Sequence, residues 1–209
     1  MGTPSLRSRR RDAAKRIEAE RKGARRLRYD EVGGQIRTGD LLFFRGRGPF
    51  SRLIRWMSYS VYSHMGIAAR WAGHLLVFQS HIPTGVEVVP ARRIVFRYDG
   101  QVDWWTVKPE HDGRLDRDRL LSAAVGELGK PYSFLGLVAL GFKLLGGKIA
   151  GRRDPVALPE GYFCSQFVSA CYREAGLDLA PDVEDSCTSP GAIVRSGIVE
   201  MKAVLRRPR

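Results

Sequence analysis

Two residues far apart in the chain carry side chains that together can do nucleophilic chemistry. Cys164 stands where a helix is predicted to begin, and His64 opens a strand-like run 100 positions earlier. A thiol beside an imidazole can form a thiolate nucleophile, because the imidazole accepts the proton. The positive end of a helix dipole also lowers the pKa of a cysteine in the first turn. This pair therefore predicts covalent catalysis by a cysteine.

The residues around this pair indicate how it is held. Phe167, Val168 and Cys171 recur at helical spacing after Cys164, so the helix should be buried against a sheet with Cys164 at its mouth. Cys171 is then a core residue, and Cys187 has no assigned role. The alternative for each member of the pair is structural, because cysteines at helix starts and histidines in strands are also found as ordinary core residues.

A third group should orient the imidazole and fix its tautomer. Gln79 and His81 share one face of the next predicted strand, and we select Gln79. Glu87 and Asp103 are less well placed alternatives. Gly66, beside His64 on its own strand face, should leave room for a substrate or a facing helix.

Other kinds of site find little support in the sequence. The residues His64, His81, Cys164 and Cys187 show no recurrent short ligand spacing, so we expect no metal. No glycine-rich segment sits between a strand and a helix as a phosphate loop requires, and we expect no cofactor. Basic charge is present without a nucleic-acid motif, so specific nucleic-acid binding is not expected.

The hydrophobic pattern predicts the elements that must position the pair. Apolar alternation, β-branched residues and turn signals predict six strands, over Leu41–Phe44, His64–Arg70, Leu75–His81, Val86–Val89, Val102–Val107 and Ile198–Leu205. Helical spacing predicts helices over Arg7–Arg28, Pro49–Trp56, Leu115–Leu128 and Cys164–Ala175, and a short one opening at Ser189–Gly191. The five strands up to Val107 are interpreted as an antiparallel meander. Together these elements predict an α+β fold, with an antiparallel sheet of about five to six strands packed against helices.

The charge of the chain is strongly uneven. The net charge is +13, and residues 1–30 hold eleven Lys and Arg against four Asp and Glu. We predict a basic N-terminal arm over residues 1–34, helical or mobile, before one domain over residues 35–209. The Arg7–Arg28 segment is expected to contact an anionic polymer or a membrane; the alternative is a solvated arm that aids solubility.

Composition also bears on compartment and membrane. Three cysteines, an odd number, argue against a disulfide framework, and no apolar segment follows the charged N-terminus as a secretory signal requires. We therefore expect a cytoplasmic protein, with membrane or cell-wall association as the alternative. Phe134–Ile149 is mostly apolar but shorter than the roughly 20 residues of a membrane span. We interpret this segment as a buried or partly exposed helix and hairpin, with interfacial contact as the alternative.

These motifs, in this order, resemble the NlpC-type papain-like hydrolases. The segments that carry the resemblance are Gly39–Phe44, His64–Ile67, Val77–Ser80, Gly129–Tyr132 and Tyr162–Gln166. The cysteine follows the histidine, as in the circularly permuted branch of that superfamily, which includes relatives of lecithin-retinol acyltransferase. The resemblance covers residues 35–204 and leaves out the basic arm. It implies a permuted papain-like fold.

The resemblance also implies roles for individual residues. Cys164 corresponds to the nucleophile and His64 to the base, while Gln79 falls where the permuted branch often has Glu. Met65 and Gln166 likewise depart from the usual Val and Glu. The candidates for binding the oxyanion or the substrate are Tyr162, Ser165 and His81.

Three functions follow as expectations. The first is a cysteine hydrolase, an amidase or endopeptidase, cleaving an amide bond through an acyl-enzyme; the resemblance implies peptidoglycan peptides as its substrate. The second is a lipid acyltransferase, lipase or thioesterase at a membrane surface, which the apolar Phe134–Ile149 segment and the basic arm favour. The third is a non-catalytic binding or structural module on the same fold.

Overall fold

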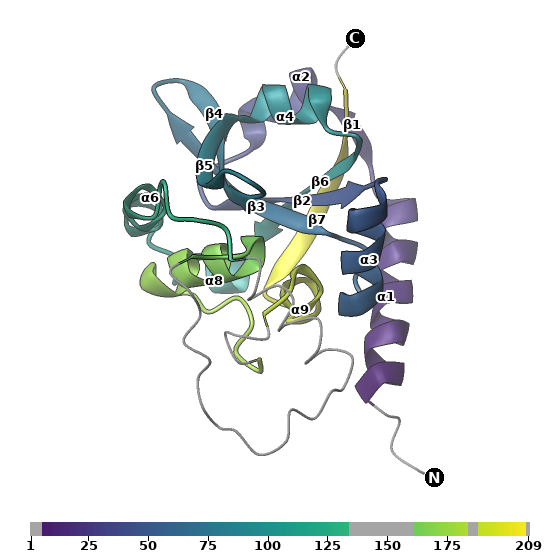
Figure 1. Ribbon diagram of the computed structural model, residues 1–209. Coiled ribbons are helices and arrows are strands. Elements are labelled where there is room, and N and C mark those ends of the chain that lie inside the picture. The colour runs from purple at the N-terminus through teal and green to yellow at the C-terminus, as the bar shows by residue number, and fades with distance from the viewer. Residues whose placement is uncertain (1–5, 134–160, 184–187, 208–209) are drawn as a thin grey trace, which may run out of the picture.

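A seven-stranded sheet forms the centre of the computed structural model, which describes residues 6–133, 161–183 and 188–207 (Figure 1). The strand order is β1-β7-β6-β2-β3-β4-β5. The strands are β1 (Arg26–Arg28), β2 (Asp40–Gly46), β3 (His64–Trp71), β4 (His74–His81), β5 (Gly85–Pro90), β6 (Gly100–Val107) and β7 (Val199–Arg206). Every pairing is antiparallel except that of β1 with β7. The predicted α+β class is confirmed.

Two features of the sheet differ from the sequence prediction. The sheet has one strand more than the six that were predicted, because β1 in the basic arm pairs in parallel with β7. The predicted meander is correct for β2 to β5 but wrong for β6, which returns across the sheet to pair with the other edge of β2. The register joins Leu42 to Trp104 and Leu41 to Trp105, so two aromatic side chains of β6 cover opposite faces of the centre.

Both faces of the sheet are covered, which explains the unbroken apolar run of β2. Leu41 and Phe43 point to one face and Leu42 and Phe44 to the other, and all four are buried. The first face packs against α6 (Arg117–Gly126), α8 (Cys164–Glu174) and α9 (Pro190–Arg195). The second packs against α2 (Tyr29–Val32) and α4 (Ala91–Arg97). Figure 1 shows these two helical layers on either side of the sheet.

The remaining helices are α1 (Leu6–Gly23), α3 (Pro49–Ser58), α5 (Pro109–Asp112) and the 3₁₀ turn η1 (Gly33–Gln35). The predicted helices correspond to α1, α3, α6, α8 and α9; α2, α4 and α5 are additional. α8 starts at the predicted residue, Cys164, and Gly176 follows its end with a φ of +89°, a conformation that favours glycine. The Phe134–Ile149 segment and Cys187 lie outside the described residues. Within the described ranges, no helix has the length and apolarity to cross a bilayer.

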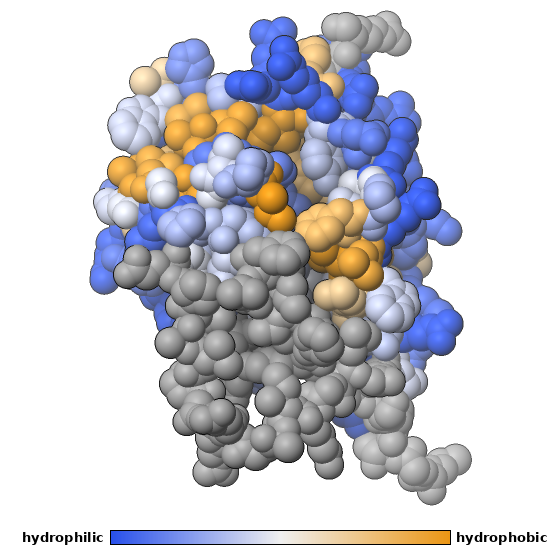
Figure 2. Space-filling model, in the orientation of Figure 1, coloured by the Kyte–Doolittle hydropathy of each residue, from blue (hydrophilic) through white to orange (hydrophobic). Residues whose placement is uncertain are grey.

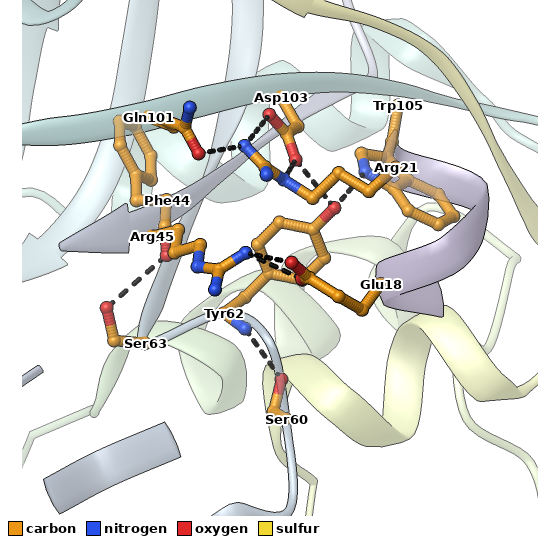
Figure 3. A network of polar contacts seen from close by, with 10 residues as sticks. All are labelled: Glu18, Arg21, Phe44, Arg45, Ser60, Tyr62, Ser63, Gln101, Asp103 and Trp105. Carbon is orange, nitrogen blue, oxygen red and sulfur yellow. Dashed lines mark hydrogen bonds and ion pairs between the residues drawn. The ribbon is translucent and has the colours of Figure 1, made fainter. Parts of the chain in front are cut away.

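The helix of the basic arm packs against the domain through buried charge (Figure 3). Ala13 and Ile17 of α1 are buried. One turn further on, the Arg21 guanidinium is buried against the carboxylate of Asp103 on β6, at 2.5 Å from Nε to Oδ2. The Tyr62 hydroxyl donates to the same carboxylate at 2.8 Å. The arm is therefore helical from Leu6 to Gly23, and it packs against the domain through Ala13, Ile17 and Arg21.

Two further contacts hold the same helix. Glu18 forms an ion pair with Arg45 of β2 at 2.6 Å, and Arg21 also donates to the Gln101 side chain at 2.6 Å. Burial raises the pKa of Asp103, while Arg21 opposes that rise as the nearest positive charge. The Arg21 guanidinium thus lowers the free-energy cost of keeping the buried Asp103 carboxylate ionised.

Replacing Arg21 with Ala should therefore destabilise the fold strongly. The change leaves a buried carboxylate without its partner, which typically costs about 3–5 kcal/mol. Urea denaturation followed by circular dichroism measures the loss. Lys22→Ala is the matched control, because Lys22 is exposed on the same helix and its removal should change stability by less than about 0.5 kcal/mol. Equal stability of the two variants would contradict the role given to Arg21.

Candidate active site

His64 lies at the first position of β3, where only β2 pairs with the strand. Phe44 of β2 is its register partner, and the two rings lie 5.1 Å apart between centroids. The β3–β4 pairing begins later, at Ile67 with Phe78. The half-buried His64 ring therefore lies beyond the end of the β3–β4 ladder.

The imidazole is held by a chain of two further side chains. His64 Nε2 lies 2.8 Å from Gln79 Oε1, and Gln79 Nε2 donates to Glu87 Oε1 at 2.8 Å. A carboxylate only accepts hydrogen bonds, so Glu87 fixes which end of the amide faces it. The amide oxygen must then face His64, which puts the proton on Nε2 and leaves Nδ1 as the basic nitrogen.

The backbone register explains how this chain of contacts forms. Gln79 of β4 is directly opposite Glu87 of β5, so the two side chains share one face of the hairpin. A Cβ on Gly66 would lie 2.7 Å from Val77 Cγ1 and 3.3 Å from Gln79 Cβ. The space beside Gly66 is therefore filled by β4 side chains, and the prediction that a substrate or a helix would use it is wrong.

The environment keeps His64 neutral. Its pKa is lowered to about 4, mainly by burial and also by the nearby His81, whereas the hydrogen bond to Gln79 and the charge of Glu87 act in the opposite direction. The His81 ring is 5.6 Å away and edge-on. At neutral pH the imidazole is thus unprotonated and can accept a proton.

Cys164 is the first residue of α8, and backbone donors surround its sulfur. Phe163 provides no side-chain cap, and the first helical backbone bond is donated by Phe167, so the amides of the first turn are not used inside the helix. The amides of Met65, Ser165 and Cys164 itself favour the thiolate. Burial outweighs them and raises the pKa of Cys164 to about 11. The side chain is only 5% exposed, so the resting group is a neutral thiol.

The structure brings Cys164 to the strand that carries His64. Met65, whose amide faces the sulfur, is the residue directly after His64. The Ser80 hydroxyl of β4 donates to the Tyr162 carbonyl, two residues before Cys164, at 2.6 Å. The segment leading into α8 is thus held beside the start of β3 and the end of β4. In the described part of the chain, no hydrogen bond joins the imidazole to the thiol, so the predicted Cys164–His64 pairing stays a prediction.

A pocket of about 460 Å³ reaches His64 from the surface. Its walls come from α3, the start of β3, the end of β4 and two separate tyrosines, and they contain no Lys, Arg, Asp or Glu. The lining residues are Phe50, Ser51, Ile54, Ser63, His64, Ser80, His81, Ile82, Tyr98 and Tyr132. Cys164 does not line the pocket. Burial raises the pKa of Tyr98 and Tyr132 in the pocket wall, and the charge of a Cys164 thiolate would raise both further.

The other candidate residues are placed differently. Ser165 is buried, and its hydroxyl donates to the Thr188 carbonyl at 2.9 Å while also lying near the Cys164 sulfur. The Tyr162 ring packs against Lys130 and Phe167, with the Glu127 carboxylate beside its hydroxyl. His81 is exposed at the pocket rim.

Two alternatives considered from the sequence have other roles. Asp103 forms an ion pair with Arg21 and accepts a hydrogen bond from Tyr62, and it has no hydrogen bond with His64 among the described residues. Cys171 is buried as predicted, and burial raises its pKa to about 12.

Sequence reasoning undervalued Glu87 and missed Tyr98 and Tyr132. Counting residues across the turn at Pro83–Gly85 would have paired Glu87 with Gln79, which is the signal that could have found it. Tyr98 follows α4, and its hydroxyl interacts with Ser51 and Ser63, so it ties α3 to the start of β3. No local pattern marks such a contact.

No protein-family model matches the chain, and the curated proteins contain no match. Among solved structures, the chain resembles the metalloprotein YiiX of Escherichia coli O157:H7, described as DUF1105. The two share 18% sequence identity with a TM-score of 0.57, over 81% of this chain and 97% of YiiX. The likeness concerns the fold alone.

YiiX is described as a metalloprotein, which raises the question of whether this chain has the side chains of a metal site. Metal sites require several His, Cys, Asp or Glu side chains converging on one point. Among residues 6–133, 161–183 and 188–207, no three such side chains come together in this way. The described residues therefore do not fit a metal centre.

The pH dependence of Cys164 alkylation should reveal the raised pKa. The rate of iodoacetamide labelling should rise about tenfold per pH unit up to pH 10 without a plateau. The reason is that the thiolate becomes the main form only as the pH approaches about 11. Peptide mass spectrometry separates Cys164 from the other cysteines. The urea-unfolded protein is the control and should plateau above about pH 8.5. A plateau below about pH 7 in the folded protein would show a resting ion pair and contradict the neutral thiol.

Proposed function

We propose that the protein is a cysteine-dependent hydrolase that cleaves an amide or ester bond through an acyl-enzyme on Cys164. The observation that carries this proposal is the directed chain from Glu87 through Gln79 to His64, which leaves a basic Nδ1 on the residue next to the sulfur's amide donor. A histidine that served only packing would not need its tautomer fixed in this way.

The reaction begins from a neutral pair. Sγ of Cys164 attacks the substrate carbonyl carbon while its proton passes to Nδ1 of His64, so a C–S bond forms and the carbonyl oxygen becomes an oxyanion. The free amides at the start of α8, those of Cys164 and Ser165, are the donors that can stabilise this oxyanion. The tetrahedral intermediate collapses, the leaving amine or alcohol takes the proton from His64, and a thioester remains.

Hydrolysis of the thioester completes the cycle. Nδ1 of His64 accepts a proton from water as the hydroxide attacks the thioester carbonyl, and the C–S bond then breaks. The sulfur recovers its proton from His64, and a carboxylic acid is released. In both steps His64 is transiently an imidazolium, and Gln79 and Glu87 stabilise that charge because both act to raise its pKa.

The pocket supports an uncharged, apolar group beside the scissile bond. Its lining combines Phe50, Ile54 and Ile82 with the rings of Tyr98 and Tyr132. The volume of about 460 Å³ is within the range of small-molecule sites. An acyl or aromatic group fits this lining better than the charged stem peptide of peptidoglycan, which remains the substrate that the family resemblance implies.

A lipid acyltransferase or lipase is the second candidate, and the same apolar pocket favours it. The chemistry to the thioester is identical, and only the acceptor differs: an amine or alcohol in place of water. The third candidate, a non-catalytic module, is favoured by the burial of Cys164 and its raised pKa. Turnover separates these candidates.

Hydrolysis of a substrate panel tests the proposal. The panel contains p-nitroanilides and p-nitrophenyl esters with short and medium-length acyl chains, together with purified peptidoglycan. Cys164→Ala should abolish turnover, and His64→Ala should lower kcat by roughly 10²–10⁴, the usual contribution of a general base. Gln79→Leu should lower kcat, because it removes both the acceptor for Nε2 of His64 and the donor to Glu87.

Cys171→Ala is the matched control, because it removes a second thiol from the same helix without touching the candidate site. Its kcat should equal that of the wild type. Turnover that survives Cys164→Ala, or no turnover of any substrate by a wild-type protein shown to be folded, would overturn the proposal. Transfer of the acyl group to an added amine or alcohol in preference to water would favour the second candidate.

A further inference from the structure

Helix α3 exposes its apolar side chains instead of burying them. Phe50, Leu53 and Trp56 are 45%, 48% and 64% exposed, and their spacing of three residues puts them on one side of the helix. Figure 2 shows apolar side chains gathered over the α3 region, bordered by hydrophilic ones. A helix that only packed on the domain would turn this side inward. The outward face defined by Phe50, Leu53 and Trp56, the α3 face, is thus free for a partner.

The α3 face adjoins the pocket that reaches His64. Phe50 belongs to both, and Ile54 lies in the pocket wall. Across the pocket, Ile82 is a further exposed apolar residue of the lining. The apolar surface therefore runs from α3 to the mouth of the pocket, so a partner seated on α3 lies at the entrance to the candidate site.

Exposed positive charge borders the α3 face. The sequence contains no Asp or Glu from position 41 to position 86, while arginines occur at 45, 47, 52 and 55. Arg45 is paired with Glu18. Arg47 and Arg52 are exposed and have no ion pair with the described residues. Exposed arginines beside Trp, Leu and Phe form the side-chain set of helices that lie in the interface of anionic membranes.

We propose that the α3 face docks onto an anionic lipid surface, with Phe50, Leu53 and Trp56 inserted among the lipids and Arg47 and Arg52 at the headgroups. The exposed Arg47 and Arg52, which have no ion pair with the described residues, favour this partner over a second copy of the chain, which would bring the same arginines face to face. The docking itself needs no catalysis. Its consequence, that an acyl chain enters the pocket directly from the lipid, rests on the proposed function.

Vesicle flotation of the full chain tests the docking. The vesicles contain phosphatidylcholine alone or phosphatidylcholine with phosphatidylglycerol. The wild type should float with the anionic vesicles, and Leu53→Glu/Trp56→Ala should bind them at least about tenfold more weakly, since each large apolar side chain returned to water contributes about that factor. Trp71→Ala is the matched control: Trp71 is 52% exposed, at the β3–β4 hairpin, and its loss should leave flotation unchanged.

A spectroscopic measurement distinguishes insertion from charge attraction. Brominated phospholipid should quench the tryptophan fluorescence of Trp71→Phe, in which Trp56 remains, and much less that of Trp56→Phe. Unchanged flotation of Leu53→Glu/Trp56→Ala would assign binding to another part of the chain, such as the arginines of α1, and overturn the proposal. The proposal would also be overturned if the wild type bound no vesicles but self-associated, and if Leu53→Glu/Trp56→Ala no longer self-associated. That result would assign the α3 face to a second copy of the chain.

The cysteine chemistry provides an independent readout. Alkylation of Cys164 without vesicles should be the same in the wild type and in Leu53→Glu/Trp56→Ala, because the α3 face does not touch the sulfur. If docking fails while Cys164-dependent turnover of water-dispersed substrates persists, the docking proposal alone is lost. If docking succeeds without turnover, the hydrolase proposal alone is lost.

Discussion

The candidate site depends on how the first turn of α8 packs against the beginning of β3. Within the described pairing, β2 alone is the register partner of the first residues of β3, and the amide of Met65 faces the Cys164 sulfur. The Ser80–Tyr162 hydrogen bond fixes the segment that enters the helix. A displacement of this helix end would move the thiol away from the strand of His64, whatever the orientation of the imidazole. The anchoring contacts therefore come from β3 and β4 together, which are also the strands that hold His64 and Gln79.

The second constraint is the burial of the reacting groups. Burial lowers the pKa of His64 to about 4 and raises that of Cys164 to about 11, so both groups rest neutral. Charge is created only when the proton moves. The donors needed at that moment are already oriented, with backbone amides near the sulfur and the Gln79–Glu87 relay behind the imidazole. Such preorganised dipoles stabilise charge that develops during a reaction without reorganising, which is the main way in which enzymes lower barriers.

Local sequence patterns predicted the helix and the strand that carry the candidate site. The features that the sequence did not predict depend on long-range contacts. The start of α8 at Cys164 and the start of β3 at His64 follow from apolar periodicity and turn residues. The three-residue β1 is too short to show a period, and the return of β6 to β2 has no local signature. The sequence placed Arg21 in the basic arm without a partner inside the domain, because only the folded chain brings Asp103 to it. Glu87 and the tyrosines of the pocket wall entered the site through cross-strand register and tertiary packing.

Acid-quenched mass spectrometry of the acyl-enzyme tests the central claim most directly. The protein is mixed at neutral pH with a p-nitrophenyl ester of a medium-chain fatty acid, quenched in acid and digested. The account predicts one acyl group, on the peptide that contains Cys164, formed rapidly in the wild type and far more slowly in His64→Ala. An acyl group found only on another residue, or labelling of Cys164 at the same rate without the imidazole, would contradict it.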